Sequence, residues 1–212
     1  MKGIFRKDLY FIMQNQKAFL LCIGIFTVSW VLQAVHDTDS TLMSAVIFLY
    51  GAMLPHILLT HDTQSHFLSS ISAMPVTRRQ YLGEKYLLVL AAQAIISVFG
   101  LAVMLICDMI AGKGIQADSF ADLLLCMSVG LLFPAVNIPV WTLLFDKGKA
   151  IFQLSSIIMG ACLGAVISIA IATTDQLTVK LPTACVAFAL SAALFGLSYC
   201  IASAIFLRKD IR

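Results

Sequence analysis

Histidine is the residue type of this sequence with the clearest capacity for metal binding, and there are four. Three of them, His56, His61 and His66, recur at intervals of five residues. Five residues advance a helix by about 500°, so each histidine lies about 140° round the axis from the one before. The three do not converge on one face, and their spacing predicts no metal site. His56 alone falls within an apolar run, where it either lines a wet cavity or hydrogen-bonds to a neighbouring backbone group.

Motifs for nucleotide binding and catalysis are missing from the sequence. No G-x-x-x-x-G-K-[ST] phosphate loop occurs, since Gly112–Lys113 is followed by glycine. There is also no serine nucleophile elbow, H-E-x-x-H or C-x-x-C motif. The six cysteines lie in or at the ends of apolar runs, without a metal-ligand spacing. We therefore expect neither an enzyme active site nor a cofactor or metal in this chain.

The composition identifies the class of protein. Hydrophobic residues make up 60% of the 212 residues and charged residues only 12%, and the mean hydropathy is +0.96. A soluble domain carries about 25% charged residues. So little charge leaves too little polar surface to face water, which predicts an integral membrane protein.

Six apolar runs are long enough to cross a bilayer, which takes about 20 residues of helix. We predict an all-α protein with a single transmembrane domain over residues 1–212. The expected spans are 18–35, 42–60, 86–107, 123–145, 151–172 and 184–207.

The distribution of charge predicts the orientation. Twelve of the fourteen Lys and Arg residues lie at the two termini and in the second and fourth connections. The other side holds only Lys113 and Lys180. By the positive-inside rule the basic side is cytoplasmic, with both termini inside. The net charge of +3 then reflects topology, and nucleic acid is not an expected partner.

Two segments on the basic side have amphipathic patterns. Residues 1–17 read as an interfacial helix lying on the inner leaflet, or equally as a plain basic anchor. The second connection reads as a short helix over His61–Met74, ended by Pro75, and then a capping box that starts at Thr77. The short helix either docks on a partner or lies passively on lipid. Its apolar side consists of Phe67, Leu68, Ile71 and Met74.

The fourth and fifth expected spans carry helix-specific signals. Pro134 and Pro139 flank Asn137, a pattern of bent helices that line substrate sites but also of ordinary membrane helices. Gly160 and Gly164 allow close helix approach, either within one chain or between two. The middle of the spans carries no charged residue. That argues against a proton- or sodium-driven transporter, which would need such charges.

The segment from Ser72 to Tyr86 resembles a known family, the six-span permeases of the ABC type-2 exporter class. Its SAMPVTRRQYLGEKY is similar to the S-x-P-[VI]-[ST]-R pattern of that class, which ends in Lys before an aromatic residue. The patch from Phe145 to Ala150 and the opening Lys7–Asp8–Leu9 add to the resemblance. The closest in look are permease subunits of phenol-soluble-modulin-type peptide exporters.

The resemblance implies a permease subunit that exports an amphipathic peptide, lipid or drug. Two copies of a separate ATPase subunit, which bind ATP and Mg, would dock on the short cytoplasmic helix. A second copy of this chain or a close homologue would complete the pathway in a bacterial cytoplasmic membrane. Arg78 and Arg79 would flank the docking helix, and Lys147 and Lys149 would lie at the second cytoplasmic turn. The alternatives are a secondary transporter or small channel without an ATPase, and a membrane scaffold.

Overall fold

The computed structural model describes residues 2–14, 16–35, 47–48, 51–65, 67, 76–110, 117–144, 157 and 181–208. These residues are helical except for Met53, Ser65, Val76 and Thr77, which confirms the all-α prediction. The described helices are α1 (Lys2–Gln14), α2 (Gln16–Val35), α4 (Leu54–Gln64), α6 (Arg78–Ile110), α7 (Ala117–Leu144) and α9 (Leu181–Arg208).

Three of these helices are long and apolar enough to cross a membrane, over Arg78–Met109, Phe120–Leu144 and Leu181–Arg208. They correspond to the spans expected at 86–107, 123–145 and 184–207. The span expected at 18–35 coincides with the 20-residue helix α2, whose apolar part Leu20–Ser29 is shorter. The span expected at 42–60 is described only in part, and the one at 151–172 lies outside the described residues except for Ile157.

Helix α6 begins where the sequence predicts. The Thr77 hydroxyl accepts a hydrogen bond from the Gln80 backbone N–H at 3.3 Å, and the Gln80 side chain accepts one from the Thr77 N–H at 3.0 Å. This reciprocal pair is the predicted capping box. The 33 residues of α6 extend about 50 Å, whereas a hydrocarbon core is about 30 Å thick. The helix is therefore long enough to project beyond the membrane.

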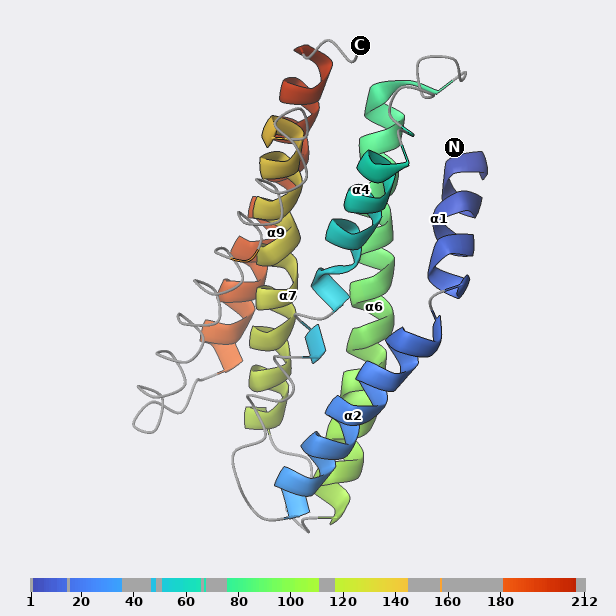
Figure 1. The fold of residues 1–212 in the computed structure, drawn as a ribbon. Coiled ribbons are helices and arrows are strands. Elements are labelled where there is room, and N and C mark those ends of the chain that lie inside the picture. The colour runs from blue at the N-terminus through green and yellow to red at the C-terminus, as the bar shows by residue number, and fades with distance from the viewer. Residues whose placement is uncertain are drawn as a thin grey trace.

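The helices form an elongated bundle, in which α7 packs along α9 and both contact α6 (Figure 1). The start of α1, the start of α6 and the end of α9 lie at one end of this bundle. Arg78 joins two of them by donating a hydrogen bond to the Phe206 carbonyl at 3.3 Å. We call this end the charged end. A core around Tyr81, Trp141 and Phe206 lies here, and a second core around Phe48, Val103 and Cys126 lies toward the other end.

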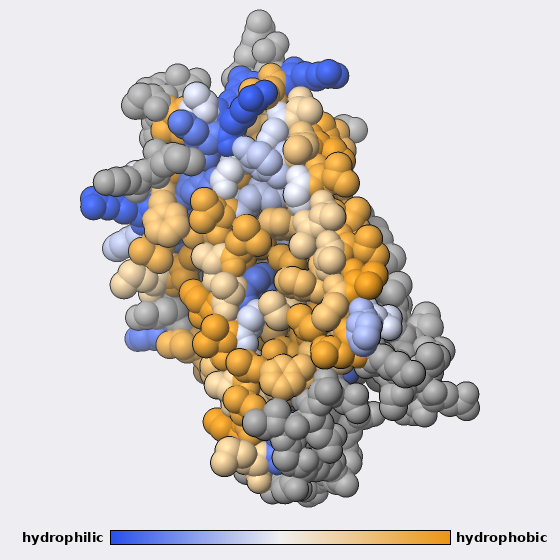
Figure 2. Space-filling view, turned by 180° about the vertical axis from the view of Figure 1, so that it is seen from behind, coloured by the Kyte–Doolittle hydropathy of each residue, from blue (hydrophilic) through white to orange (hydrophobic). Residues whose placement is uncertain are grey.

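Helix α1 lies lengthwise beside α6 (Figure 1). That residues 1–17 lie on the inner leaflet stays a prediction. Its Ile4 and Asp8 are buried against the other helices. Phe5, Leu9 and Met13 are exposed on another side of the helix, where lipid can cover them. Figure 2 shows hydrophilic side chains gathered at the charged end above a broad hydrophobic belt.

Candidate functional site

A buried ion network lies at the charged end and joins three helices. Lys85 of α6 forms ion pairs with Asp8 of α1 and, at 2.7 Å, with Asp62 of α4. Lys7 of α1 pairs with Asp62 and lies 3.3 Å from Asp8. Tyr81 of α6 donates a hydrogen bond to Asp62 at 2.7 Å. Asp8, Asp62 and Lys85 are almost completely inaccessible to solvent, so these pairs are little screened.

The electrostatics of Asp62 follow from these contacts. Burial alone would raise the pKa of the Asp62 carboxyl, but the ammonium groups of Lys85 and Lys7 outweigh burial and hold the pKa below its ordinary value. Asp62 is therefore ionised at neutral pH and accepts three donors at once. Removing one member of such a buried set leaves an uncompensated charge behind.

The network arises because charged residues occupy positions within apolar helical stripes. On α6, Lys85 follows Tyr81 and Leu82 by one turn and precedes Val89 by another, and all four are buried. On α1, Asp8 lies one turn after the buried Ile4. In the sequence, the lysines indicate topology, and Lys7, Asp8, Tyr81 and Lys85 lie in segments that carry the family resemblance. The signal that could have revealed the network is a basic residue, Lys85, within the apolar stripe of α6 and an acidic residue, Asp8, within the apolar stripe of α1.

Phe67 connects the network to the segment expected to dock on a partner. Its side chain is half-buried and packs against the core of the charged end. The Lys7 ammonium lies 3.6 Å from the centroid of the Phe67 ring, a cation–π contact. Of the flanking arginines, Arg78 is half-buried and Arg79 is exposed. The other expected docking and dimer residues lie outside the described residues: Leu68, Ile71, Met74, Lys147, Lys149, Gly160 and Gly164.

The two prolines of α7 free backbone carbonyls that side chains of neighbouring helices then bind. Pro134 lacks the N–H that would bond the Gly130 carbonyl, and the Gln93 amide of α6 donates to that carbonyl at 3.1 Å. Pro139 likewise frees the Ala135 carbonyl, which accepts the Ser198 hydroxyl of α9 at 2.5 Å.

Helix α7 continues through both prolines without a break, because neighbouring helices satisfy the freed groups in place of water. The prolines therefore have a clear packing role. Whether they also line a substrate pathway stays a prediction.

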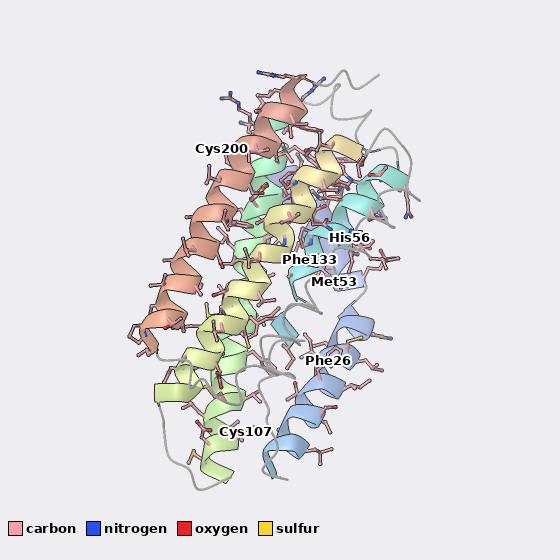
Figure 3. All side chains as sticks on the ribbon, turned by 90° about the vertical axis from the view of Figure 1, so that its left-hand side faces the viewer. Phe26, Met53, His56, Cys107, Phe133 and Cys200 are labelled. Carbon is pink, nitrogen blue, oxygen red and sulfur yellow. The ribbon has the colours of Figure 1, made fainter. Side chains whose placement is uncertain are left out.

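The structure brings two expected pathway residues together. His56 of α4 hydrogen-bonds to Asn137 of α7, and Asn137 is fully buried. Figure 3 shows His56 in the upper half of the bundle, near Phe133 and above Met53. Close by in sequence, Thr63 of α4 accepts a hydrogen bond from the Trp141 indole of α7 at 3.2 Å. Polar contacts therefore run along the interface between α4 and α7.

Comparison with known proteins places the chain in a family. The model of the family described as ABC-2 family transporter protein matches residues 3–207, nearly the whole chain. No curated protein and no solved structure matches the chain. The match includes the ion network and the proline-bearing helix as well as the resembling segment at the second connection. The chain belongs to the ABC-2 transporter family.

Proposed function

We propose that this chain is the membrane-spanning permease subunit of an ATP-binding-cassette exporter. It moves an amphipathic peptide, lipid or drug outward, and a separate subunit in two copies binds Mg and ATP. The family match supports a transport component without its own ATPase site. The segment from Ser72 to Tyr86, which resembles peptide-exporter permeases, supports the choice of substrate class.

The observation that carries this proposal is the contact of Phe67 with the ion network. A subunit that uses ATP bound elsewhere must receive force through a docking element. Phe67 lies in the segment expected to dock, and its ring lies against Lys7, which pairs with Asp62. A displacement of this segment therefore acts directly on α1 and α4. Through Lys85 it also acts on α6, a helix long enough to span the membrane.

The test is a reconstituted complex of this chain with an ATP-binding-cassette ATPase encoded beside it. Phe67→Ala removes the ring that joins the expected docking segment to Lys7 and to the core of the charged end. We expect lower permease-stimulated ATP hydrolysis and unchanged membrane insertion. Asp118→Asn, near the start of α7 at the opposite end of the bundle, is the control and should leave hydrolysis unchanged. Normal stimulation in Phe67→Ala would argue against docking here.

The remaining parts of the proposal concern assembly and pathway. Two copies of the chain meet through Gly160 and Gly164, whose small side chains permit close helix approach. The substrate passes along the α4–α7 interface at His56 and Asn137, where polar contacts are concentrated. The chain resides in the bacterial cytoplasmic membrane with the charged end and both termini inside, because basic residues concentrate there.

A further inference from the structure

Glu84 is a buried carboxyl group that the ion network does not neutralise. Only 4% of the residue is exposed to solvent. Neither of its carboxyl oxygens has a hydrogen-bond partner among the described residues. It is also the only glutamate in the chain.

The charges around Glu84 are already matched without it. The charged groups that act on it are Asp8 and Lys7 of α1, Asp62 of α4 and its neighbour Lys85. The two lysines pair with the two aspartates. An ionised Glu84 would therefore be a third carboxylate facing two ammonium groups, both of which are engaged elsewhere.

Among the described residues of α1 and α4, the other side chains near Glu84 supply no compensating cation. One turn along α6, Leu88 lies in an apolar cluster of Leu54, Leu58, Phe11 and Ile12. Two described titratable side chains nearby contact other groups. The His61 ring of α4 lies 4.3 Å from the Phe11 ring, and Tyr81 donates to Asp62.

Helices packed on other sides of α6 supply no cation for Glu84 within the described part of the chain. Tyr199 of α9 faces Tyr86, with ring centroids 5.3 Å apart. Lys17 of α2 is exposed. The acidic residues of α7 lie in its first turns, at the opposite end of the bundle. Burying an unpaired carboxylate is so unfavourable that the group takes up a proton instead.

We propose that Glu84 is a proton-binding site. A proton from the adjacent aqueous side binds the carboxylate as an O–H bond, and the network then holds two cations and two anions. Helix α1 both supplies Asp8 and packs against the Glu84 side of α6. Docking of α1 and binding of the proton therefore favour each other, since linkage between two equilibria is reciprocal. This inference does not depend on the substrate or on the ATPase.

The experiment uses the single glutamate as its own label. The full chain, made with ¹³C in the glutamate side-chain carboxyl and an expression tag free of glutamate, is placed in lipid nanodiscs. Its ¹³C signal reports Glu84 alone. At about pH 6, well above the ordinary glutamate pKa of about 4.3, we expect the chemical shift of the protonated acid. The shift of a carboxylate in the wild-type chain would overturn the proposal.

Variants separate charge balance from other causes. Asp8→Asn removes one carboxylate, so the remaining two match the two lysines, and the Glu84 signal should move to the ionised position at the same pH. Asp122→Asn, on α7 far from the network, should leave the signal protonated. A signal that stays protonated in Asp8→Asn would overturn the charge-balance argument. Glu84→Gln, which mimics the neutral acid, should unfold at a higher temperature than the wild type at neutral pH, because unfolding lets Glu84 ionise in water while glutamine has no proton to lose. An equal or lower temperature would contradict the proposal.

Discussion

Ser198→Ala tests whether side chains replace the hydrogen bonds that proline removes from α7. The Ser198 hydroxyl donates to the Ala135 carbonyl at 2.5 Å. Because its proton is used there, it accepts the Tyr86 hydroxyl at 2.6 Å. Pro139 offers no N–H to Ala135. The substitution therefore leaves a buried carbonyl and a buried phenol without these partners.

The magnitude follows from the two groups left unpaired. A buried donor or acceptor without a partner costs about 1–3 kcal/mol. Hydrogen bonds between membrane helices are worth less, about 0.6 kcal/mol on average and about 1.7 at most, because the unfolded chain finds other partners. We expect Ser198→Ala to lower the free energy of unfolding by about 1–3 kcal/mol. Unfolding in mixed micelles with rising denaturing detergent, followed by circular dichroism, measures it.

Ser191→Ala is the matched control on the same helix. Ser191 and Ser198 are both 4% exposed, so each substitution removes one hydroxyl at equal burial. The Ser191 hydroxyl bonds the Ala187 carbonyl one turn back at 2.9 Å, and that carbonyl keeps its helical N–H. The loss should stay within about 0.5 kcal/mol.

A double-mutant cycle with Pro139→Ala completes the test. Alanine at this position restores an N–H for the Ala135 carbonyl, so Ser198→Ala should cost less in that background. We expect a coupling of at least about 0.5 kcal/mol. Equal losses of stability in the two serine variants would refute the argument. A loss from Ser198→Ala that is the same with proline and with alanine at position 139 would refute it too.

Two further predictions concern the ion network. Lys85→Met leaves Asp8 and Asp62 with one partly exposed lysine, and should lower the free energy of unfolding by about 3–5 kcal/mol. Lys17→Met, at an exposed position, is the control. Equal losses of stability for the two variants in a detergent-unfolding assay would contradict the network. The lowered pKa of Asp62 stabilises the fold fully above about pH 4 and loses this contribution as the pH falls through the folded-state pKa. The protection of α1 amides, which is the exchange rate compared with the intrinsic rate at each pH, should therefore fall as the pH drops below about 4, and Asp62→Asn should remove that acid step.

The helices were predictable from the sequence because hydrophobic length and capping act locally. The capping box at Thr77 and Gln80 needs only residues three positions apart. Helix boundaries were less predictable. Helix α6 starts eight residues before the expected span at 86, because a polar first turn can be helical outside the hydrocarbon. Helix α4 likewise runs through to Gln64, so the expected boundary near residue 60 does not interrupt it.

The pairing of distant polar groups could not be predicted in the same way. Asp8 and Lys85 are 77 positions apart in the chain, and nothing local to either residue identifies the other. The same holds for Ser198 and Ala135, which lie 63 positions apart. A proline in a helix predicts that the carbonyl four residues earlier lacks its helical hydrogen bond. Which hydroxyl then binds that carbonyl depends on how α9 packs on α7.

The two sets of buried polar groups have opposite mechanical consequences. Along α7, the freed carbonyls of Gly130 and Ala135 each have a partner from another helix, which fixes α6 and α9 against α7. At the charged end, Glu84 has no hydrogen-bond partner among the described residues. A satisfied contact resists change, whereas an unbalanced charge can be neutralised by a proton or relieved by movement of α1. If an ATPase acts at the charged end, the bundle is held rigid at mid-height and rearranges most easily at the end on which the ATPase acts.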